Sequence, residues 1–389
     1  MLVLLAALVA LGPLSVDMYL PAMPIMMRAL DTNISAMHLT MSSYLTGFAV
    51  FHLVCGPLGD RFGRRPILIG GSLLFVCASI GCTLAENIQE MMVFRFVQGV
   101  GACVGPTLAR AVARDVFGPT RAARALSLIA MLMALAPAIA PALGSVLLLW
   151  MPWQIIFAFL AAYGALMILL VYLFLAESLP VKQSLHPLSI LRNYGQLLRH
   201  VEFMTAAIAS SMIYAGLMIY LASSSFVYID MLGVPQAHFG LVFTTTVIGY
   251  ILGSGLSARL AHGQRPERQV VQGACLASGA TLTMTCGHFL SPDSIAALLI
   301  PMVLYAAGMG LTLPNAMAVA LRPFPQIAGT ASALLGFIQM SISASATALV
   351  GLFLKDTPAP MALMMAAVTS IALLLSFLLL VQPRPATQA

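Results

Sequence analysis

Two charged residues, Asp17 and Arg95, lie inside long apolar runs of a chain in which only 8% of the residues are charged. An ionisable side chain in the hydrocarbon of a bilayer costs about 2.5–3.5 kcal/mol on insertion scales, so it normally faces a cavity or a partner. Asp17 lies at helical spacing from Pro13 and Pro21, and a proline frees backbone carbonyls that need a protected or wet environment. This pattern favours a carboxylate that binds and releases a proton. The alternative is an acid that reaches water at the end of its helix.

Arg95 begins a stripe of small residues in a later run. Gly99 and Pro106 follow it at positions i+4 and i+11, which share one helix face. Small residues permit close helix approach, so we expect the guanidinium to be held inside the bundle, where it needs an acid, carbonyls or water. Asp17 is the obvious acid in the membrane part of the N-terminal half, and we expect the two side chains to interact directly or through water. The alternative is an arginine that reaches the outer surface beside Glu90.

The composition is that of a protein whose solvent is lipid. Hydrophobic residues make up 61% of the 389 residues, and the mean hydropathy is +0.99. A soluble domain has about 25% charged residues, far more than are found here. The net charge of +6 comes from arginines in short segments between apolar runs, with no continuous basic patch, which argues against nucleic acid as a partner.

Apolar runs of about 20 residues, the length that crosses a bilayer, recur along the chain. The sequence predicts twelve, at residues 1–27, 38–59, 67–85, 90–112, 122–149, 154–176, 203–229, 238–260, 269–290, 295–321, 327–354 and 360–382. The one long polar interval, 177–202, divides them into six and six. We therefore expect an all-α membrane protein with twelve transmembrane helices in two pseudo-symmetric six-helix bundles, 1–176 and 203–389, joined by a cytoplasmic central loop at 177–202.

Lysines and arginines gather on one side of this predicted topology. One set of connections, which includes the central interval and the C-terminal segment, holds Arg61, Arg64, Arg65, Arg114, Arg121, Arg124, Lys182, Arg192, Arg199, Arg265, Arg268, Arg322 and Arg384. The other set holds only Arg28 and Lys355. Cytoplasmic loops carry an excess of these residues, so the first set is predicted to be cytoplasmic. An even number of spans then places both termini on that side.

The two halves carry related motifs, which indicates an internal duplication. A Gly-x-Gly pair leads to a proline and, eight residues on, to an arginine, once as Gly99, Gly101, Pro106 and Arg114 and again as Gly308, Gly310, Pro314 and Arg322. A fainter match sets Gly255 and Arg259 against Gly56 and Asp60, with the sign of the charge reversed. A duplicated six-helix unit is typical of a carrier whose halves rock about a site between them.

The most charged stretch of the chain is the short connection between the second and third runs. Its residues of interest are Gly56, Gly59, Asp60, Arg61, Gly63, Arg64, Arg65 and Pro66. We expect the arginines to bind carbonyls or acids of neighbouring cytoplasmic loops, such as Asp115, and to hold the cytoplasmic side shut until these contacts break. Arginines that only anchor the topology would need neither the glycines nor the proline, so this alternative is less favoured.

The fifth run contains two prolines and a glycine on one helix face. These residues, Pro137, Pro141 and Gly144, bend or thin the helix. The pattern predicts either a close-packed pivot against the other half or a generic kinked helix, and the sequence does not separate the two.

Candidate substrate-binding residues are polar or aromatic side chains in other apolar runs. They are Tyr44, Phe48 and His52 in the second run, Tyr214 and Tyr220 in the seventh, Asn315 in the tenth and Gln339 in the eleventh, together with Asp17. The buried amides each need a hydrogen-bond partner. For His52, a structural hydrogen bond is favoured over a role as a proton relay.

Several classes of protein and site are disfavoured. The six cysteines lie in apolar runs without a C-x-x-C pair or a histidine at ligand spacing, so neither disulfides nor a metal site is expected. The sequence has no nucleophile–base pair and no phosphate-binding loop, which disfavours an enzyme or an ATP-driven pump, and we expect no cofactor. A channel needs a polar pore with rings of charge or carbonyls, and no run supplies a matching stripe.

With these motifs assembled, the sequence resembles the major facilitator superfamily and, within it, the bicyclomycin and chloramphenicol resistance (Bcr/CflA) family of bacterial drug:proton antiporters. The resemblance covers the chain nearly end to end. It rests on Asp17-Met-Tyr-Leu-Pro-Ala-Met-Pro24, Gly56 to Pro66, Arg95-Phe-Val-Gln-Gly-Val-Gly101, Asn315-Ala-Met-Ala and Ala328-Gly-Thr-Ala-Ser332.

The resemblance implies a monomeric, proton-coupled multidrug efflux antiporter of the bacterial inner membrane. Its partners would be lipid, protons and small apolar or amphiphilic antibiotics, which it would export by alternating access and without a cofactor. Asp17 would be the site of protonation and substrate competition, and Arg95 would couple it to conformational change. One departure is that alanines precede Pro137 and Pro141 where the family's fifth helix usually reads G-P-x-x-G-G, which relaxes the closest packing. The alternatives are an exporter of a sugar or amino acid on the same fold and, less favoured, a membrane channel.

Overall fold

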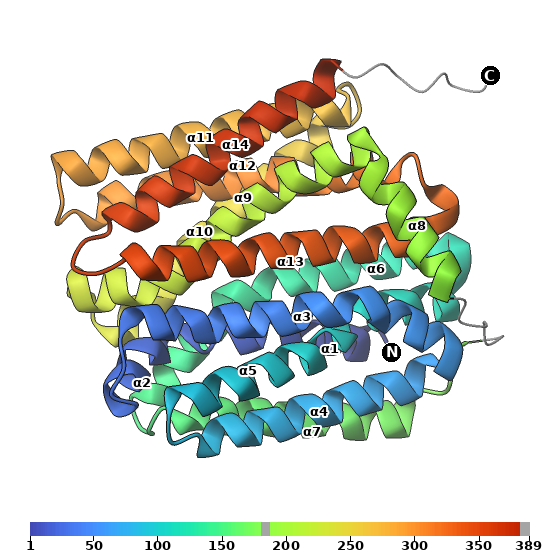
Figure 1. Cartoon of the computed structure of the whole chain (residues 1–389), viewed down its shortest axis with the longest axis horizontal. Coiled ribbons are helices and arrows are strands. Elements are labelled where there is room, and N and C mark those ends of the chain that lie inside the picture. Colours follow the sequence, from blue (N-terminus) through green and yellow to red (C-terminus); the bar gives the residue numbers. More distant parts are fainter. Residues whose placement is uncertain (180–186, 382–389) are drawn as a thin grey trace.

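The computed structural model describes residues 1–179 and 187–381, and for residues 119–135 and 187 it describes only the backbone. Within this part of the chain every regular element is helical and no strand is present (Figure 1). The N-terminal half contains α1 (Leu2–Asp17), η1 (Leu20–Ala22), α2 (Met23–Ala29), α3 (Ile34–Phe62), α4 (Arg64–Leu84), α5 (Ile88–Ala102), α6 (Val104–Leu148) and α7 (Gln154–Phe174). The C-terminal half contains α9 (Val201–Ser225), η2 (Phe226–Met231), η3 (Gln236–His238), α10 (Phe239–Leu260), α11 (Pro266–Leu290), α12 (Ile295–Leu321), η4 (Pro325–Ile327), α13 (Ala328–Phe353) and α14 (Ala359–Val381), and α8 (Pro187–Arg199) precedes it.

The helices match the predicted membrane spans. Ten helical segments of the described chain are long and apolar enough to cross a bilayer. The two remaining predicted runs correspond to α11 and to the section of α6 after Gly118, a residue with φ 66° at which two helices meet without a loop. The all-α architecture and ten of the twelve predicted spans are therefore confirmed, and α11 and the second section of α6 lie where the other two are predicted.

The two halves repeat one packing scheme. In the N-terminal half α1 packs on α6, α3 on α5, α4 on α5 and α4 on α7. The corresponding spans of the C-terminal half pair in the same way, as α9 with α13, α10 with α12, α11 with α12 and α11 with α14. Between the halves, α3 packs on α13 and α6 packs on α10, and these two contacts are also equivalent under the repeat. The duplication suggested by the motifs is thus present in the packing.

The first predicted span is interrupted at its centre. α1 ends at Asp17 and the short helix η1 follows, because Pro21 has no amide hydrogen to donate to the carbonyl of Asp17. Pro13 lies inside α1 without ending it. The interruption therefore places Asp17 at a helix end in the interior of the bundle.

The connections rich in arginine lie together at the end of the molecule that carries α8, which we call the arginine-rich end; the opposite end carries α2 (Figure 1). The central interval at this end was predicted as a loop, but its described part contains the amphipathic helix α8. Leu197 of α8 is fully buried in a cluster with Phe203 of α9, and Tyr194 donates a hydrogen bond to the carbonyl of Leu53, 2.8 Å away in α3. Lys182, Arg384 and the side chains of Arg121 and Arg124, which were also predicted to be cytoplasmic, lie outside the described residues.

Direct polar contacts between the halves gather toward the end opposite the arginines. Arg28 forms an ion pair of 2.6 Å with Asp230. Ser42 donates to the carbonyl of Ala344 at 2.8 Å, and Nε2 of His38 lies 3.3 Å from the hydroxyl of Ser223. At the arginine-rich end, the described hydrogen bond between the halves is the one through Tyr194 of α8. The structure therefore has its halves joined at the arginine-poor end.

Candidate functional site

The side chain of Asp17 is buried, with 3% of the residue exposed. Among the described residues, no hydrogen-bond donor or cation lies within bonding distance of its carboxylate. The helix η1, which begins three residues after Asp17, contacts α9 of the other half, so the acid lies near the junction of the halves. An acid that simply reaches water at a helix end is not what the structure shows.

Arg95 of α5 is completely buried and is held by carbonyl oxygens and aromatic rings. One terminal nitrogen, Nη1, donates to the backbone carbonyl of Ser15 at 3.0 Å and to Oε1 of Gln98 at 2.6 Å. The guanidinium carbon lies 4.4 Å from the ring centre of Tyr19 and 4.5 Å from that of Tyr44. Cations are attracted to aromatic faces at such distances, and the attraction grows when water is excluded. The burial excludes an arginine that reaches the outer surface.

Pairing of Arg95 with Asp17 was predicted to be direct or through water, and the direct form is absent. Arg95 binds the carbonyl of Ser15, two residues before the acid, and its Nε and Nη2 atoms have no hydrogen-bond partner among the described residues. The reason lies in the helix end, because the carbonyls of the last turn of α1 accept hydrogen bonds from outside. Arg95 therefore binds the same end of α1 that carries Asp17, but the two side chains do not form an ion pair.

A polar network fixes these residues in place. The hydroxyl of Ser15 lies 2.7 Å from that of Tyr44, and Nε2 of Gln98 donates to the hydroxyl of Ser79 at 2.8 Å. Ser15, Tyr19 and Ser79 were missed by the sequence reasoning. A usable signal was present in the small polar residues of otherwise apolar runs, since each of them needs a buried partner.

Glycines bring the helices of the site into contact. A Cβ atom on Gly99 of α5 would lie 2.0 Å from the carbonyl oxygen of Tyr44, and one on Gly47 of α3 would lie 2.0 Å from that of Phe96. Only glycine permits this backbone approach at both positions. The close packing predicted for the stripe that begins at Arg95 is therefore present. It brings α5 so close to α3 that the guanidinium of Arg95 is buried between the helices.

An aromatic ladder runs from the polar network toward the arginine-rich end. The ring centres of Tyr44 and Phe48 are 6.4 Å apart, and those of Phe48 and His52 are 5.7 Å apart. Nδ1 of His52 lies 3.6 Å from the sulfur of Cys103. A Cβ atom on Gly336 of α13 would lie 2.6 Å from Nε2 of the same ring. The ladder therefore lies at the junction of the two halves.

The other candidate pocket residues are not joined to this group by described contacts. The hydroxyl of Tyr220 lies 3.3 Å from that of Tyr228, inside the C-terminal half. Asn315 donates to the hydroxyl of Ser257 and to the carbonyl of Leu311, both at 2.7 Å, in a cluster between α10 and α12. Gln339 lies one helical turn beyond Gly336 on α13, and its carbonyl oxygen accepts a hydrogen bond from Ser343.

A second group of charges, which we call the N-terminal arginine cluster, occupies the arginine-rich end. It consists of Asp60, Arg64, Arg65, Asp115 and Glu177. The guanidinium of Arg64 lies 2.6 Å from Asp60 and 3.3 Å from Asp115. Nη2 of Arg65 donates to the carbonyl of Tyr172 at 2.7 Å. The cluster thereby links α3, α4, α6 and the end of α7.

Glu177 holds the start of α4 and was missed by the sequence reasoning. Its carboxylate accepts the amide hydrogens of Arg64 at 2.9 Å and Arg65 at 3.2 Å. Burial alone would raise the pKa of Glu177, but the amide donors of Leu179, Arg64 and Arg65 outweigh it and the pKa is lowered. An anion at a helix N-terminus is also favoured by the helix dipole.

The glycines of this connection differ in importance. Gly63 has φ 109°, and a Cβ atom there would lie 2.4 Å from Oε2 of Glu177. A Cβ atom on Gly56 would have no neighbour within 4 Å. Arg61 is exposed and lies over the ring of Phe62, 5.3 Å from its centre, with no described contact to an acid.

The C-terminal half has an equivalent group, which we call the C-terminal arginine cluster: Glu202, Glu267 and Arg322. Arg322, at the end of α12, forms ion pairs with Glu202 at the start of α9 and with Glu267 at the start of α11, the latter at 2.7 Å.

Gly144 of the fifth span faces the interrupted first span. A Cβ atom there would lie 2.5 Å from the carbonyl oxygen of Met18, next to Asp17. Contact with the other half is made two residues earlier, where a Cβ atom on Gly240 of α10 would lie 2.6 Å from Cα of Ala142. The predicted close contact between the halves is therefore present at this helix, but Gly144 itself packs within its own half.

Comparison with known proteins identifies the family. The family model described as Major Facilitator Superfamily matches residues 5–348. The chain is 34% identical over 370 residues to an uncharacterized MFS-type transporter, YdgK, of Bacillus subtilis, covering 93% of this chain and 90% of the relative. The chain belongs to the Major Facilitator Superfamily. Its members are transporters, so the expectation that the chain is not an enzyme is confirmed.

Relatives within the superfamily include resistance proteins. A bicyclomycin resistance protein homolog of Haemophilus influenzae is 30% identical over 380 residues, covering 96% of this chain and 94% of the relative. A multidrug resistance protein, MdtL, of Escherichia coli O157:H7 is 30% identical over 337 residues, covering 86% of this chain and 84% of the relative. These relatives bear out the resemblance to the Bcr/CflA family.

Solved structures of the superfamily share the fold at low sequence identity. A bacterial homolog of the human lysosomal transporter Spinster, in an inward-facing, occupied conformation, gives a TM-score of 0.77 at 16% identity and covers 99% of this chain and 98% of its own. A D-xylose-proton symporter gives a TM-score of 0.76 at 15% identity and covers 97% of both chains. At this identity the likeness establishes the major facilitator fold alone.

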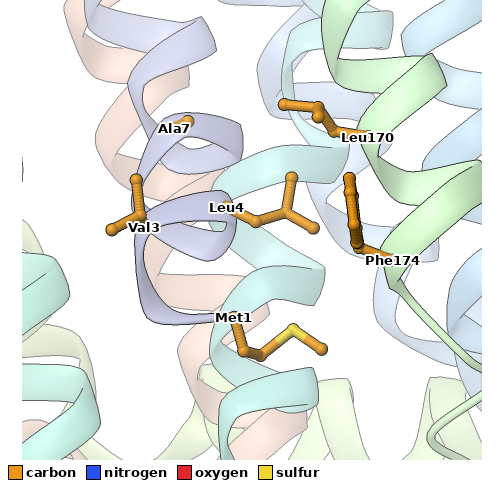
Figure 2. Close-up of a pocket in the computed structure, with 6 residues that line it drawn as sticks. All are labelled: Met1, Val3, Leu4, Ala7, Leu170 and Phe174. Atoms are coloured by element: carbon orange, nitrogen blue, oxygen red, sulfur yellow. The ribbon is translucent and has the colours of Figure 1, made fainter.

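The superfamily member also has an apolar pocket on its outer surface (Figure 2). The pocket has a volume of about 300 Å³ and is lined by Met1, Val3, Leu4, Ala7, Leu170 and Phe174. It lies between the first turns of α1 and the end of α7, and Asp17 is at the other end of α1. At 1.5 Å per residue, about 20 Å separate Leu4 from Asp17 along the helix axis. The pocket is therefore not part of the polar site.

Proposed function

We propose that the protein is a proton-coupled multidrug efflux antiporter of the bacterial inner membrane, with its arginine-rich end in the cytoplasm. The observation that carries the proposal is the carboxylate of Asp17, which is buried and has no cation within bonding distance among the described residues. A charged group without a partner is costly to bury, whereas its neutral form is not. Binding of one proton therefore changes the energy of the site substantially.

Arg95 couples the protonation of Asp17 to a movement of the first span. Its guanidinium is held by the carbonyl of Ser15 and by the ring of Tyr19, both in the segment that contains Asp17. When Asp17 is charged, the unpaired Nε and Nη2 atoms of Arg95 draw the carboxylate toward the guanidinium. When Asp17 is neutral, that attraction is lost. The first span then shifts relative to α5, and the interruption at η1 allows the shift without breaking a continuous helix.

The cycle follows from the contacts between the halves. In this structure the ion pair between Arg28 and Asp230 joins the external ends, so a drug enters from the cytoplasm or inner leaflet. Drug binding favours loss of the proton, the halves rock, the drug leaves, and an external proton resets the carrier. Proton and drug need only disfavour each other's binding, and this coupling is reciprocal. We propose that the N-terminal arginine cluster, whose contacts all lie within one half, holds that half together while the halves rock.

The substrates we propose are small apolar or amphiphilic antibiotics of the bicyclomycin and chloramphenicol type. The resistance proteins among the relatives support this class. The aromatic ladder of Tyr44, Phe48 and His52 supplies flat apolar surface at the junction of the halves, and Tyr214 supplies a hydroxyl group from the opposite side. Tyr220, Asn315 and Gln339 stay candidates for contact with the drug from the C-terminal half, where the polar groups of Tyr220 and Asn315 already have partners.

The test is transport by the purified chain in proteoliposomes. Chloramphenicol or bicyclomycin movement is followed with and without an imposed pH gradient, for the wild type and for Asp17→Asn. We expect the gradient to drive accumulation at least tenfold in the wild type. In Asp17→Asn the gradient has no effect, but exchange of labelled for unlabelled drug persists, because the neutral variant still binds and rocks.

A matched control is Asp31→Asn. Asp31 is exposed at the external end and has φ 45°, a conformation that asparagine adopts readily, so this variant removes one carboxylate without strain. It should transport like the wild type. Equal gradient-driven transport in Asp17→Asn and the wild type would refute the role of Asp17. Absence of gradient-driven transport in a wild type that still exchanges drug would refute antiport.

A further inference from the structure

Arg110 is a charged residue for which the mechanism above has no role. It lies in α6, one helical turn before Arg114, in the fourth predicted span, and the sequence reasoning overlooked it. Both arginines are exposed, although Ala109 and Val112, which lie between or beside them on the helix, are fully buried. An exposed arginine within a membrane span normally faces water inside the protein and not lipid.

Neighbouring contacts fix the direction in which Arg110 points. Seven residues make nearly two turns of a helix, so Arg110 lies on the same face as Cys103, about 10 Å nearer the arginine-rich end. The sulfur of Cys103 lies 3.6 Å from His52 of α3, and His52 contacts Gly336 of the other half. The adjacent face of α6, at Gly105, packs against Leu8 of α1. Arg110 therefore points toward the junction of the halves, below the aromatic ladder.

The equivalent position in the other half carries no charge. Arg110 follows Pro106 by four residues, and Ala318 follows Pro314 by the same interval in the repeated motif. Pro314, Met317 and Ala318 are exposed on α12. One half thus presents a cation at this depth, while its counterpart presents apolar surface. An amphiphile with one negative group matches this pair of surfaces.

The acids at the arginine-rich end are already bound by other groups. Asp60 and Asp115 are held by Arg64, and Glu177 is held by backbone amides of α4. Glu202 and Glu267 are held by Arg322. Among the described residues, no carboxylate lies within ion-pair distance of Arg110. Its charge is available to an anionic ligand.

We propose that Arg110, assisted by Arg114, binds the negative group of anionic amphiphiles at the cytoplasmic mouth of the carrier. The chemical class is a weak organic acid, such as an aromatic carboxylate or sulfonate, whose apolar part lies on α12 and the aromatic ladder. The direction of transport rests on the proposed function, whereas the site itself does not. Compounds of this class are then substrates in addition to neutral antibiotics.

The charge of the substrate changes the driving force. Exchange of a neutral drug for one proton moves one charge across the membrane, and exchange of a monovalent anion for one proton moves two. Each charge multiplies the attainable accumulation ratio by about 50 for a membrane potential of 100 mV. An anionic substrate would therefore be exported more steeply with potential than a neutral one.

The test compares two ligands that differ in charge, 2-naphthoate and 2-naphthamide. Their binding to the full chain in nanodiscs of zwitterionic phosphatidylcholine is measured by equilibrium dialysis, without any gradient. We expect Arg110→Gln to weaken naphthoate binding about tenfold, the loss of roughly one charge-assisted hydrogen bond, and to leave naphthamide binding unchanged. Arg110→Lys should retain most of the naphthoate affinity, because it keeps the charge.

The control variant is Arg259→Gln, which removes an exposed arginine near the end of α10 at the same end of the molecule. It should not change naphthoate binding. Equal losses in Arg110→Gln and Arg259→Gln would overturn the proposal, because a general surface potential would then account for them. An equal loss of both ligands in Arg110→Gln would also overturn it.

A second arm separates free anions from lipid head groups. In nanodiscs that contain anionic phosphatidylglycerol, a lower naphthoate affinity of the wild type, absent in Arg110→Gln, would support the site and show that a lipid phosphate shares it. An unchanged affinity would support a site for soluble anions alone. Because binding is measured without a gradient, failure of proton coupling at Asp17 would leave these results intact.

Discussion

The two arginine clusters occupy equivalent places in the repeat, but the positions of the cation and the acid are exchanged between them. In the N-terminal cluster, Arg64 begins the third span and Asp115 ends the fourth. In the C-terminal cluster, the acid Glu267 begins the ninth span and the cation Arg322 ends the tenth. Both copies of the duplicated unit therefore have a pair of opposite charges at this junction. The helix that carries the cation in one copy carries the acid in the other. An attraction between these helix ends, and not a particular side chain, is what the architecture requires.

The clusters also differ in how they are fixed. The side chain of Arg64 is 11% exposed, whereas that of Arg322 is 45% exposed. Only in the N-terminal cluster does a carboxylate, that of Glu177, bind backbone amides, and only there does the chain turn through a glycine with positive φ. Water screens an exposed pair more than a buried one. We therefore expect the N-terminal cluster to contribute more to stability than the C-terminal cluster.

The largest effect should come from Gly63→Ala. The backbone there has φ 109°, and the added carbon meets Glu177, so the variant should lose about 2–3 kcal/mol of stability. Gly263→Ala, in the corresponding turn between α10 and α11, has no atom within 4 Å of the added carbon and should be neutral. Thermal unfolding in detergent, followed by tryptophan fluorescence, measures both. Equal effects would remove the distinction between the two clusters.

The next effect concerns the central arginines. Arg64→Ala leaves Asp60 and Asp115 without their cation and should cost about 2 kcal/mol and most of the transport activity. Arg322→Ala should cost about 1 kcal/mol or less, because its pairs are more exposed. Reversing the C-terminal pair, as Arg322→Glu with Glu267→Arg, should restore stability relative to either single change. A greater loss from Arg322→Ala than from Arg64→Ala would contradict the comparison.

The smallest effect should be a dependence on pH through Glu177. Its folded-state pKa is lowered by backbone amides, so its contribution is fully present above the unfolded pKa of about 4.3 and is lost as the pH falls through the folded value. Glu177 is exposed, so the contribution should be well below 1 kcal/mol. The difference in melting temperature between wild type and Glu177→Gln, measured from pH 7 to pH 3, should shrink toward acid. A constant difference would show that protonation is not involved.

Much of the fold could be predicted because its signals are local. Each apolar run of membrane length predicts one helix, and the arginines of the loops predict which helix ends lie at the same end of the molecule. The interruption near Asp17 followed from Pro21, because a missing amide hydrogen acts on the residues beside it. The helix α8 was not predicted because the interval 177–202 was judged by its polarity, although the helical period of its apolar residues is present in the sequence.

The site was less predictable because its contacts join distant residues. Asp17 and Arg95 stood out as charges in apolar runs, but the carbonyl of Ser15 became the partner of Arg95 because of where α1 ends. Glu177 binds an amide 113 residues away, and no spacing in the sequence marks that pair. Asn315 and Tyr220 satisfied their hydrogen bonds within their own half, which composition alone does not reveal.

The junction at Gly118 has a mechanical consequence. The fourth and fifth spans are joined there by a single residue of non-helical conformation, so the connection between them contains no loop. The section of α6 before Gly118 carries Arg110 and Asp115. The section after it carries Gly144, which packs on the first span, and Ala142, which packs on α10. Because the connection is so short, a displacement of the fourth span at the cytoplasmic mouth should also move the start of the fifth span, whose far end contacts the other half at Ala142. Inserting a few glycines after Gly118 would uncouple substrate entry from the closing of the opposite side.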